Sequence, residues 1–290
     1  MRFILLLACL TLPMSSARAD DAPPVPAPEG PAEVVDRAAA IARFQEFIAA
    51  NPERPEIAAA RFRLASLLMD QAEGHPSAAE RAAAAEQLER ALADEAAGRA
   101  EGFAQVAEAW FLLGFCRQQD DPAAAVRAWE QVLAVAPDTP LAASAGLSLG
   151  QLALDAGDWA AAAARFEAAR GGDRDAPTWA QATYLGAWSR YRAQDYPAAI
   201  GLLVELLGQE GSSAAALHRE ATATLAFTLV DAAGEAGSVP EGVAEVALSL
   251  PEARRVELIE QVVALLEQLG RFDEAGDVRG LAKKKRRRGR

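Results

Sequence analysis

The stretch LGQLALDAGDWAAAAARFEAA, residues 149–169, decides the fold of this chain. Its first part is apolar and carries Gly150, the pair Gly157-Asp158 interrupts it, and its second part is a run of alanines that leads to Phe166. Glycine often ends a helix, and an aspartate caps the next one because its carboxylate accepts hydrogen bonds from free backbone N–H groups. The stretch therefore predicts two helices joined by a tight turn.

The same pattern recurs on both sides of this stretch at a nearly fixed interval. The second helix of each pair opens with an aspartate, and an alanine and a large apolar residue follow at intervals of four. These residues are Asp121, Ala125 and Trp129, then Asp158, Ala162 and Phe166, then Asp195, Ala199 and Leu203, with copies 37 residues apart. The first helices carry Leu-Gly pairs that end at Gly114, Gly150 and Gly186, 36 residues apart. Periods in this range are typical of a helical solenoid.

These residues resemble the tetratricopeptide repeat, which places a tryptophan and a Leu-Gly pair on its first helix and small and aromatic residues on its second. The residues that match its packing positions are Trp110, Gly114, Ala125, Trp129, Gly150, Ala162, Phe166, Gly186 and Ala199. The match is clearest over 104–209, weaker over 34–97 and 252–282, and interrupted over 210–250. The resemblance implies an all-α, right-handed solenoid of helical hairpins over residues 34–282, with about twelve helices.

The composition favours the same fold class. Alanine supplies 71 of the 290 residues, and aromatic residues make up only 6%. Alanine, leucine, glutamate and arginine favour helices, whereas strands are rich in β-branched and aromatic residues. We therefore expect no sheet.

Residues 1–19 are predicted to be a secretory signal peptide, because Arg2 precedes an apolar run and Ala17-Arg18-Ala19 forms a cleavage site. An alternative is that Cys9, which follows Leu6-Leu7-Ala8, is the lipid-bearing first residue of a lipoprotein. Residues 20–33 contain five prolines and are predicted to be a linker. We expect an exported protein, periplasmic or associated with the envelope, whose single remaining cysteine, Cys116, has no disulfide partner.

Two N-terminal segments add a second resemblance. Residues 42–48 (ARFQEFI) and 60–65 (ARFRLA) look like the tetratricopeptide repeats of bacterial envelope proteins. Two such groups are the lipoprotein subunit of the outer-membrane barrel-assembly machinery and the periplasmic coordinator that works with the Tol-Pal system. This similarity implies a role in the bacterial cell envelope without assigning one.

Charge is divided between the body of the chain and its C-terminal tail. Residues 20–282 hold 20 arginines, no lysine and all 41 acidic residues, a net charge of −21. The tail, residues 283–290, holds the seven cations Lys283, Lys284, Lys285, Arg286, Arg287, Arg288 and Arg290. An acidic body repels nucleic acid, so no nucleic-acid partner is expected. The tail is predicted to bind anionic lipid or lipopolysaccharide, to fold back onto the body, or to stay solvated.

A search for catalytic and metal-binding patterns finds little. Residues 146–150 (GLSLG) match the G-x-S-x-G nucleophile elbow, but that motif needs a strand and a sharp turn where 141–156 reads as one helix. His75 and His218 lack ligand partners at helical spacing and are expected on the surface, and Cys116 is expected in the core. We therefore expect no enzyme activity, no cofactor and no metal.

The resemblance implies that first-helix residues on the inner wall of the solenoid bind a partner segment. Counted from each Leu-Gly pair, these positions are Gln118, Gln119, Gln151, Asp155, Arg190 and Tyr191, with Trp188 and Arg192 as alternatives one residue away. Their side chains can hydrogen-bond an extended backbone, and Tyr191 adds a stacking face. Two readings stay open for these positions, a partner-binding groove or the solvated side of amphipathic helices. The predicted function is a non-enzymatic interaction scaffold for a protein or peptide, with a surface adaptor anchored by the tail as the alternative.

Overall fold

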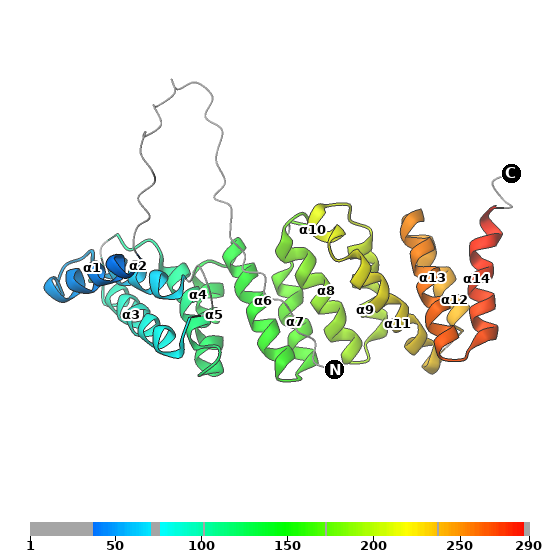
Figure 1. The fold of residues 1–290 in the computed structure, drawn as a ribbon, viewed down its shortest axis with the longest axis horizontal. Helices are drawn as coiled ribbons and strands as arrows, with labels where there is room; N and C mark the ends of the chain where they lie inside the picture. The colour runs from blue at the N-terminus through cyan, green and yellow to red at the C-terminus, as the bar shows by residue number, and fades with distance from the viewer. Residues whose placement is uncertain (1–36, 71–75, 101, 172, 237, 287–290) are drawn as a thin grey trace, which may run out of the picture. The chain divides into compact units, whose positions relative to one another are not determined.

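The computed structural model describes residues 37–70, 76–100, 102–171, 173–236 and 238–286 (Figure 1). These residues form fourteen helices and no strand, which confirms the all-α prediction. In chain order the helices are α1 (Arg37–Ala50), α2 (Ile57–Met69), α3 (Ala78–Ala96), α4 (Val106–Arg117), α5 (Pro122–Val135), α6 (Pro140–Asp155), α7 (Trp159–Ala169), α8 (Pro177–Arg192), α9 (Tyr196–Leu207), α10 (Ser212–Ala215), α11 (His218–Ala236), α12 (Val239–Ser249), α13 (Glu252–Gln268) and α14 (Phe272–Arg286). The sequence predicted about twelve helices, and α10 has only four residues.

Helices α1 to α9 follow one another in chain order, and each packs against the next (Figure 1). The first helices of successive hairpins, α2, α4, α6 and α8, also contact one another. This is the packing of a helical-hairpin solenoid, in which each hairpin buries its apolar faces against its neighbours. In the described ranges, no helix is both long and apolar enough to cross a membrane.

The predicted aspartate caps are present at the starts of α5, α7 and α9. The Oδ1 atoms of Asp121, Asp158 and Asp195 accept hydrogen bonds from the backbone N–H groups of Ala124, Ala161 and Ala198 at 2.9, 3.0 and 3.4 Å. Gly157, before the second of these aspartates, has φ +76°. Gln194 holds the same left-handed conformation before the third, at φ 63°, although it carries a side chain.

The glycines of the Leu-Gly pairs lie where two helices approach closely. A Cβ on Gly114 would lie 2.2 Å from Trp129 Nε1, and one on Gly150 would lie 2.5 Å from Phe166 Cε1. Gly186 has more room, with Phe166 Cβ 3.4 Å from the same position. The alanines of the second helices, Ala125, Ala162 and Ala199, are fully buried, and Trp110 is half-buried. The small residues of the repeat pattern thus lie where neighbouring helices meet.

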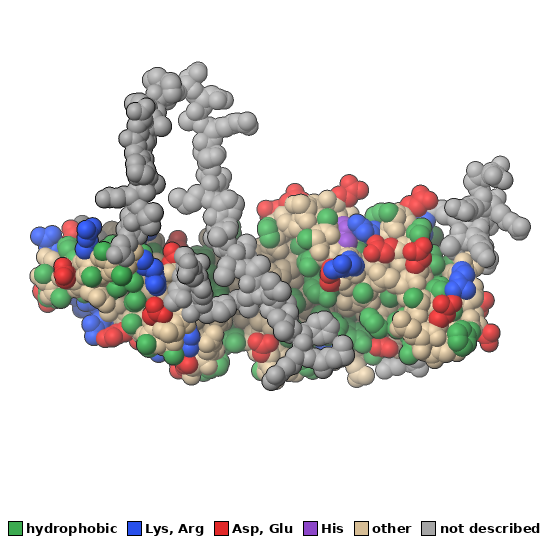
Figure 2. Space-filling view, in the orientation of Figure 1, with side chains coloured by type: hydrophobic (Ala, Val, Ile, Leu, Met, Phe, Trp, Pro, Cys, Tyr) green, Lys and Arg blue, Asp and Glu red, His purple; other side chains and the backbone are tan. Residues whose placement is uncertain are grey.

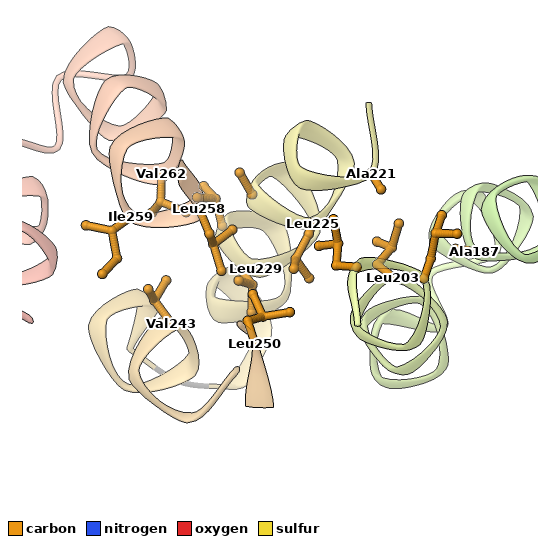
Figure 3. Packing of buried hydrophobic residues seen from close by; sticks show 14 of the residues in the cluster. Ala187, Leu203, Ala221, Leu225, Leu229, Val243, Leu250, Leu258, Ile259 and Val262 are labelled. Atoms are coloured by element: carbon orange, nitrogen blue, oxygen red, sulfur yellow. The ribbon is translucent and has the colours of Figure 1, made fainter. Parts of the chain in front are cut away.

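The largest apolar core of the described residues joins α8 and α9 to the helices that follow. Figure 3 shows Leu203 of α9 near Leu225 of α11, and Leu229 of α11 near Val243 of α12 and Leu258 of α13. Helix α11 packs against α9, α12 and α13, and α12 packs against α14. Residues 210–250, where the sequence pattern is interrupted, thus still contribute to one continuous core.

Candidate protein-interaction surface

Five side chains with aromatic rings or a guanidinium group gather where α8 ends and where α7 and α9 begin. They are Trp159 of α7, Trp188, Tyr191 and Arg192 of α8, and Tyr196 of α9, and we call them the aromatic ledge. The four rings are half-buried and Arg192 is exposed, so each residue keeps surface available to a partner.

The ledge residues are held in place by contacts with one another. The Arg192 guanidinium carbon lies 4.3 Å from the centre of the Trp159 ring, within the range of a cation–π interaction. The ring centres of Trp188 and Tyr191 are 5.4 Å apart, and those of Tyr191 and Tyr196 are 6.0 Å apart. Because the side chains are already ordered, a partner that binds them loses less conformational entropy.

Tyr191 also connects the ledge to α11. Its hydroxyl donates a hydrogen bond to Asp231 Oδ2 at 2.7 Å. This hydrogen bond is the largest of the effects that raise the Tyr191 pKa to about 12, and burial and the carboxylate charge add to it. Tyr191 is therefore a neutral donor at physiological pH, and Asp231 places a carboxylate beside the rings.

The other predicted groove residues lie at the ends of three first helices. Gln118 is the C-cap of α4, and Gln119 lies exposed in the turn that follows. Gln151 Nε2 donates to Asp155 Oδ1 at 2.8 Å on α6, and Arg190 forms an ion pair with Asp195 at 2.9 Å. Arg190 is thus paired with the residue that caps α9.

Three residues of this surface, Trp159, Tyr196 and Asp231, were not predicted from the sequence to bind a partner. The signal for the two aromatic residues was present, because each directly follows a capping aspartate, in the pairs Asp158-Trp159 and Asp195-Tyr196. Asp231 had no such signal, since only the packing of α11 brings it to Tyr191.

One segment of the chain matches a known sequence family. A sequence model of the family described as tetratricopeptide repeat matches residues 117–177, from the last residue of α4 to the first of α8. This segment of the chain carries tetratricopeptide repeat sequence. The matched range includes Gly150 and Phe166, which lie against each other between α6 and α7.

Thirty-eight chains of solved structures match this one. One is a structure of the human IFIT1 dimer with PPP-AAAA, which is 16% identical, with a TM-score of 0.31, over 86% of this chain and 68% of that chain. No curated protein matches.

His218 is not on the surface, so that prediction was wrong. The side chain is only 5% exposed, and neither ring nitrogen has a hydrogen-bond partner. Burial lowers the His218 pKa, and Arg254 of α13 adds to the shift, while the nearby backbone of Leu206 and Gln209 opposes it only in part. The sequence pattern failed here because the packing of α11 covers the first residue of the helix. His75 lies outside the described residues.

The remaining reactive side chains have structural roles. Cys116 is buried, as predicted, and burial raises its thiol pKa to about 12, so it is not a reactive thiolate. Ser148 lies within α6 and donates to the Ser144 carbonyl at 3.1 Å, so the G-x-S-x-G match has no nucleophile turn. Among the residues that the structure describes, no three His, Cys, Asp or Glu side chains form a metal site.

The charge pattern of the described surface is mixed. Figure 2 shows red acidic side chains spread over the face in view, with hydrophobic and basic side chains between them. Helix α14 continues to Arg286, so the backbone of the first four tail residues extends the last helix. Residues 287–290 lie outside the described residues, as do the predicted signal peptide and linker, and lipid binding by the tail stays a prediction.

Proposed function

We propose that this chain is a non-enzymatic interaction scaffold that binds an extended segment of a partner protein along the aromatic ledge. Tetratricopeptide repeats suggest a protein-interaction role in general, and the family is generally non-catalytic. The observation that carries the proposal is the ledge itself. Tryptophan, tyrosine and arginine contribute most of the binding energy at many interfaces, and here they are preordered and still partly exposed.

Polar side chains of α11 and α6 support binding of a polypeptide backbone. Asp231 accepts from Tyr191 through one oxygen and keeps further acceptor capacity, and Gln151 and Asp155 present an amide and a carboxylate at the end of α6. Such groups pair with the N–H and C=O groups of an extended chain. The rings would then bind apolar side chains of the same segment.

The proposal places this scaffold in the cell envelope after export. It rests on the charged and apolar pattern of residues 1–19 and on the Ala-x-Ala cleavage site. Mass spectrometry of the protein from its native host should find Asp20 as the mature N-terminus. Detection of a lipid-modified Cys9 as the mature N-terminus would instead mean that the protein is anchored to a membrane as a lipoprotein.

Partner capture with matched variants tests the binding surface. The tagged wild-type protein, the double variant Trp188→Ala/Tyr196→Ala and the control Phe272→Ala would each be used to capture envelope proteins, which mass spectrometry then quantifies. Phe272 is 68% exposed and lies outside the ledge, so it controls for loss of any surface ring.

A partner that binds the ledge should be lost at least tenfold with the double variant, equivalent to about 1.4 kcal/mol, and be unchanged with the control. Circular dichroism would confirm that both variants keep their helices. Equal recovery of every partner by all three proteins would contradict the proposal.

A further inference from the structure

Asp231 brings a negative charge to the aromatic ledge, and no cation of the described chain balances that charge. The side chain is exposed, and among the described residues its one partner is the Tyr191 hydroxyl, which donates to Oδ2 at 2.7 Å. A hydroxyl group stabilises a carboxylate but carries no charge of its own. Asp231 therefore keeps its charge and has acceptor positions free beside the Tyr191 ring.

The charges near Asp231 favour a cation at this part of the ledge. Arg190 forms an ion pair with Asp195 at 2.9 Å, so its charge is already balanced. The Asp231 charge raises the Tyr191 pKa by more than the Arg192 charge lowers it, so the carboxylate has the larger effect at that hydroxyl. The body of the chain carries a net charge of −21, which attracts cations over a longer range.

The rings next to Asp231 are of the kind that bind cations. Arg192 gives an example within the chain, because its guanidinium carbon lies 4.3 Å from the centre of the Trp159 ring and no described carboxylate forms an ion pair with it. The ring centres of Trp188 and Tyr191 are 5.4 Å apart, so a cation above the gap between them can lie within about 6 Å of both. Among the described residues, no cation lies over either of these two rings.

The chemistry of the bound segment follows from this combination of rings and carboxylate. An apolar side chain would cover Asp231 and leave its charge unpaired, and an acidic side chain would be repelled by it. A guanidinium is planar and can stack on a ring while its N–H groups donate to a carboxylate. On the basis of the proposed function, we propose that the segment that binds the ledge places an arginine over the Trp188 and Tyr191 rings, where it pairs with Asp231.

Two probes of nearly equal size test the need for a positive charge. N-acetyl-L-arginine amide carries the guanidinium, and N-acetyl-L-citrulline amide replaces it with a neutral urea group. Ligand-observed NMR titrations of the full chain at constant ionic strength would give both dissociation constants. We expect the arginine probe to bind in the millimolar range and at least roughly fivefold more tightly than the citrulline probe. Added salt should weaken binding of the arginine probe alone.

Matched variants locate the site on the ledge. Asp231→Asn should weaken binding of the arginine probe roughly fivefold and leave the citrulline probe unchanged. Asp138→Asn makes the same charge change at an exposed turn between α5 and α6, and it should change neither. Trp188→Leu should weaken the arginine probe roughly threefold, whereas Phe272→Leu, at a ring that is 68% exposed outside the ledge, should not. Circular dichroism would confirm that each variant is folded.

Three results of the titrations would each overturn the arginine site. They are no saturable binding of the arginine probe up to roughly 20 mM, equal affinity of the two probes, and equal weakening by Asp231→Asn and Asp138→Asn. The expected pattern, with selective loss in Asp231→Asn and Trp188→Leu, would support it.

Capture of envelope proteins with Asp231→Asn separates this inference from the proposed function. A partner lost both with this variant and with Trp188→Ala/Tyr196→Ala supports the two together. A partner lost with the double variant but kept by Asp231→Asn would overturn the arginine site and leave the ledge as the binding surface. Equal recovery of every partner by all the proteins would overturn both, because no partner would then bind the ledge.

Discussion

Helices α4 to α9 carry the regular repeat pattern and helices α10 to α14 do not, and the cores of α4 to α7 and of α11 to α13 are built in different ways. In α4 to α7, a glycine of the first helix lies against an aromatic ring of the second, as Gly114 does against Trp129 and Gly150 against Phe166. In α11 to α13 the core is formed by leucine, valine and isoleucine side chains (Figure 3). There the Cβ position of Gly242 is 3.7 Å from Leu229, an ordinary contact distance.

This difference explains why the repeat pattern fades along the chain. A close approach of two helices permits only glycine at the contact, so the residue type recurs wherever the approach recurs. Aliphatic side chains of similar volume replace one another at small cost, so an aliphatic core needs no fixed residue at each position. The second region also buries Thr222 and Thr228, whose hydroxyls each donate to a carbonyl one turn earlier at 2.7 Å.

The largest predicted effect contrasts a glycine from each region. Gly114→Ala should lower the free energy of unfolding by about 1–3 kcal/mol, because the added carbon overlaps Trp129 and displaces its Nε1 hydrogen bond to the Phe111 carbonyl. Gly242→Ala should raise it by up to about 1 kcal/mol, because alanine favours the helix and the space is free. Urea unfolding measures both. Equal losses of unfolding free energy in the two variants would mean that the helices approach equally closely at both glycines.

The second prediction concerns acid and the second region alone. The His218 pKa is lower in the folded protein than in the unfolded chain, so the unfolded chain binds more protons below about pH 6.5. Stability should therefore fall as the pH drops below that value. His218→Leu removes this contribution. The free energy of unfolding of the variant should therefore increase relative to that of the wild type as the pH falls from 7.5 to 5.5. The facing groups Arg254 and Glu257 are the same in both proteins. Parallel curves of unfolding free energy against pH for the two proteins would refute the prediction.

The third prediction tests the turns of the regular region. Gln194→Gly should raise the free energy of unfolding by about 0.5–1 kcal/mol, because Gln194 pays a steric penalty at φ 63° that glycine does not. Gly157→Gln, at the matching turn one repeat earlier, should lower it by a similar amount. Thermal unfolding of both variants checks the pair, and changes of the same sign would contradict it.

The smallest effect is expected where the two regions meet. Tyr191→Phe removes the hydrogen bond between α8 and Asp231 of α11, and should cost about 0.5–1 kcal/mol because the pair is exposed. In Asp231→Asn the Tyr191 pKa should fall from about 12 toward its ordinary value, since the carboxylate that raises it is gone. Ultraviolet titration of tyrosine ionisation follows this change, and an unchanged profile would show that Asp231 does not hold Tyr191.

Sequence reasoning located part of the candidate site. It selected Tyr191 and gave Trp188 and Arg192 as alternatives one residue away, and all three lie in the ledge. It assigned Gln151 and Asp155 to the same surface but had no means to see that they bond each other. It missed Asp231 because a contact between separate helices leaves no mark in the local pattern.

The sequence by itself determined the helices, their caps and the register of the hairpins. These features depend on local propensity, on a capping side chain such as Asp158, and on glycine where axes approach, and each is visible within one repeat. Only the tertiary structure decided that Arg192 covers Trp159, that His218 is buried, and that Asp231 accepts a hydrogen bond from Tyr191. Those contacts join residues from different helices, and their positions depend on how each helix rotates and packs against its neighbours, which small and interchangeable apolar residues do not specify.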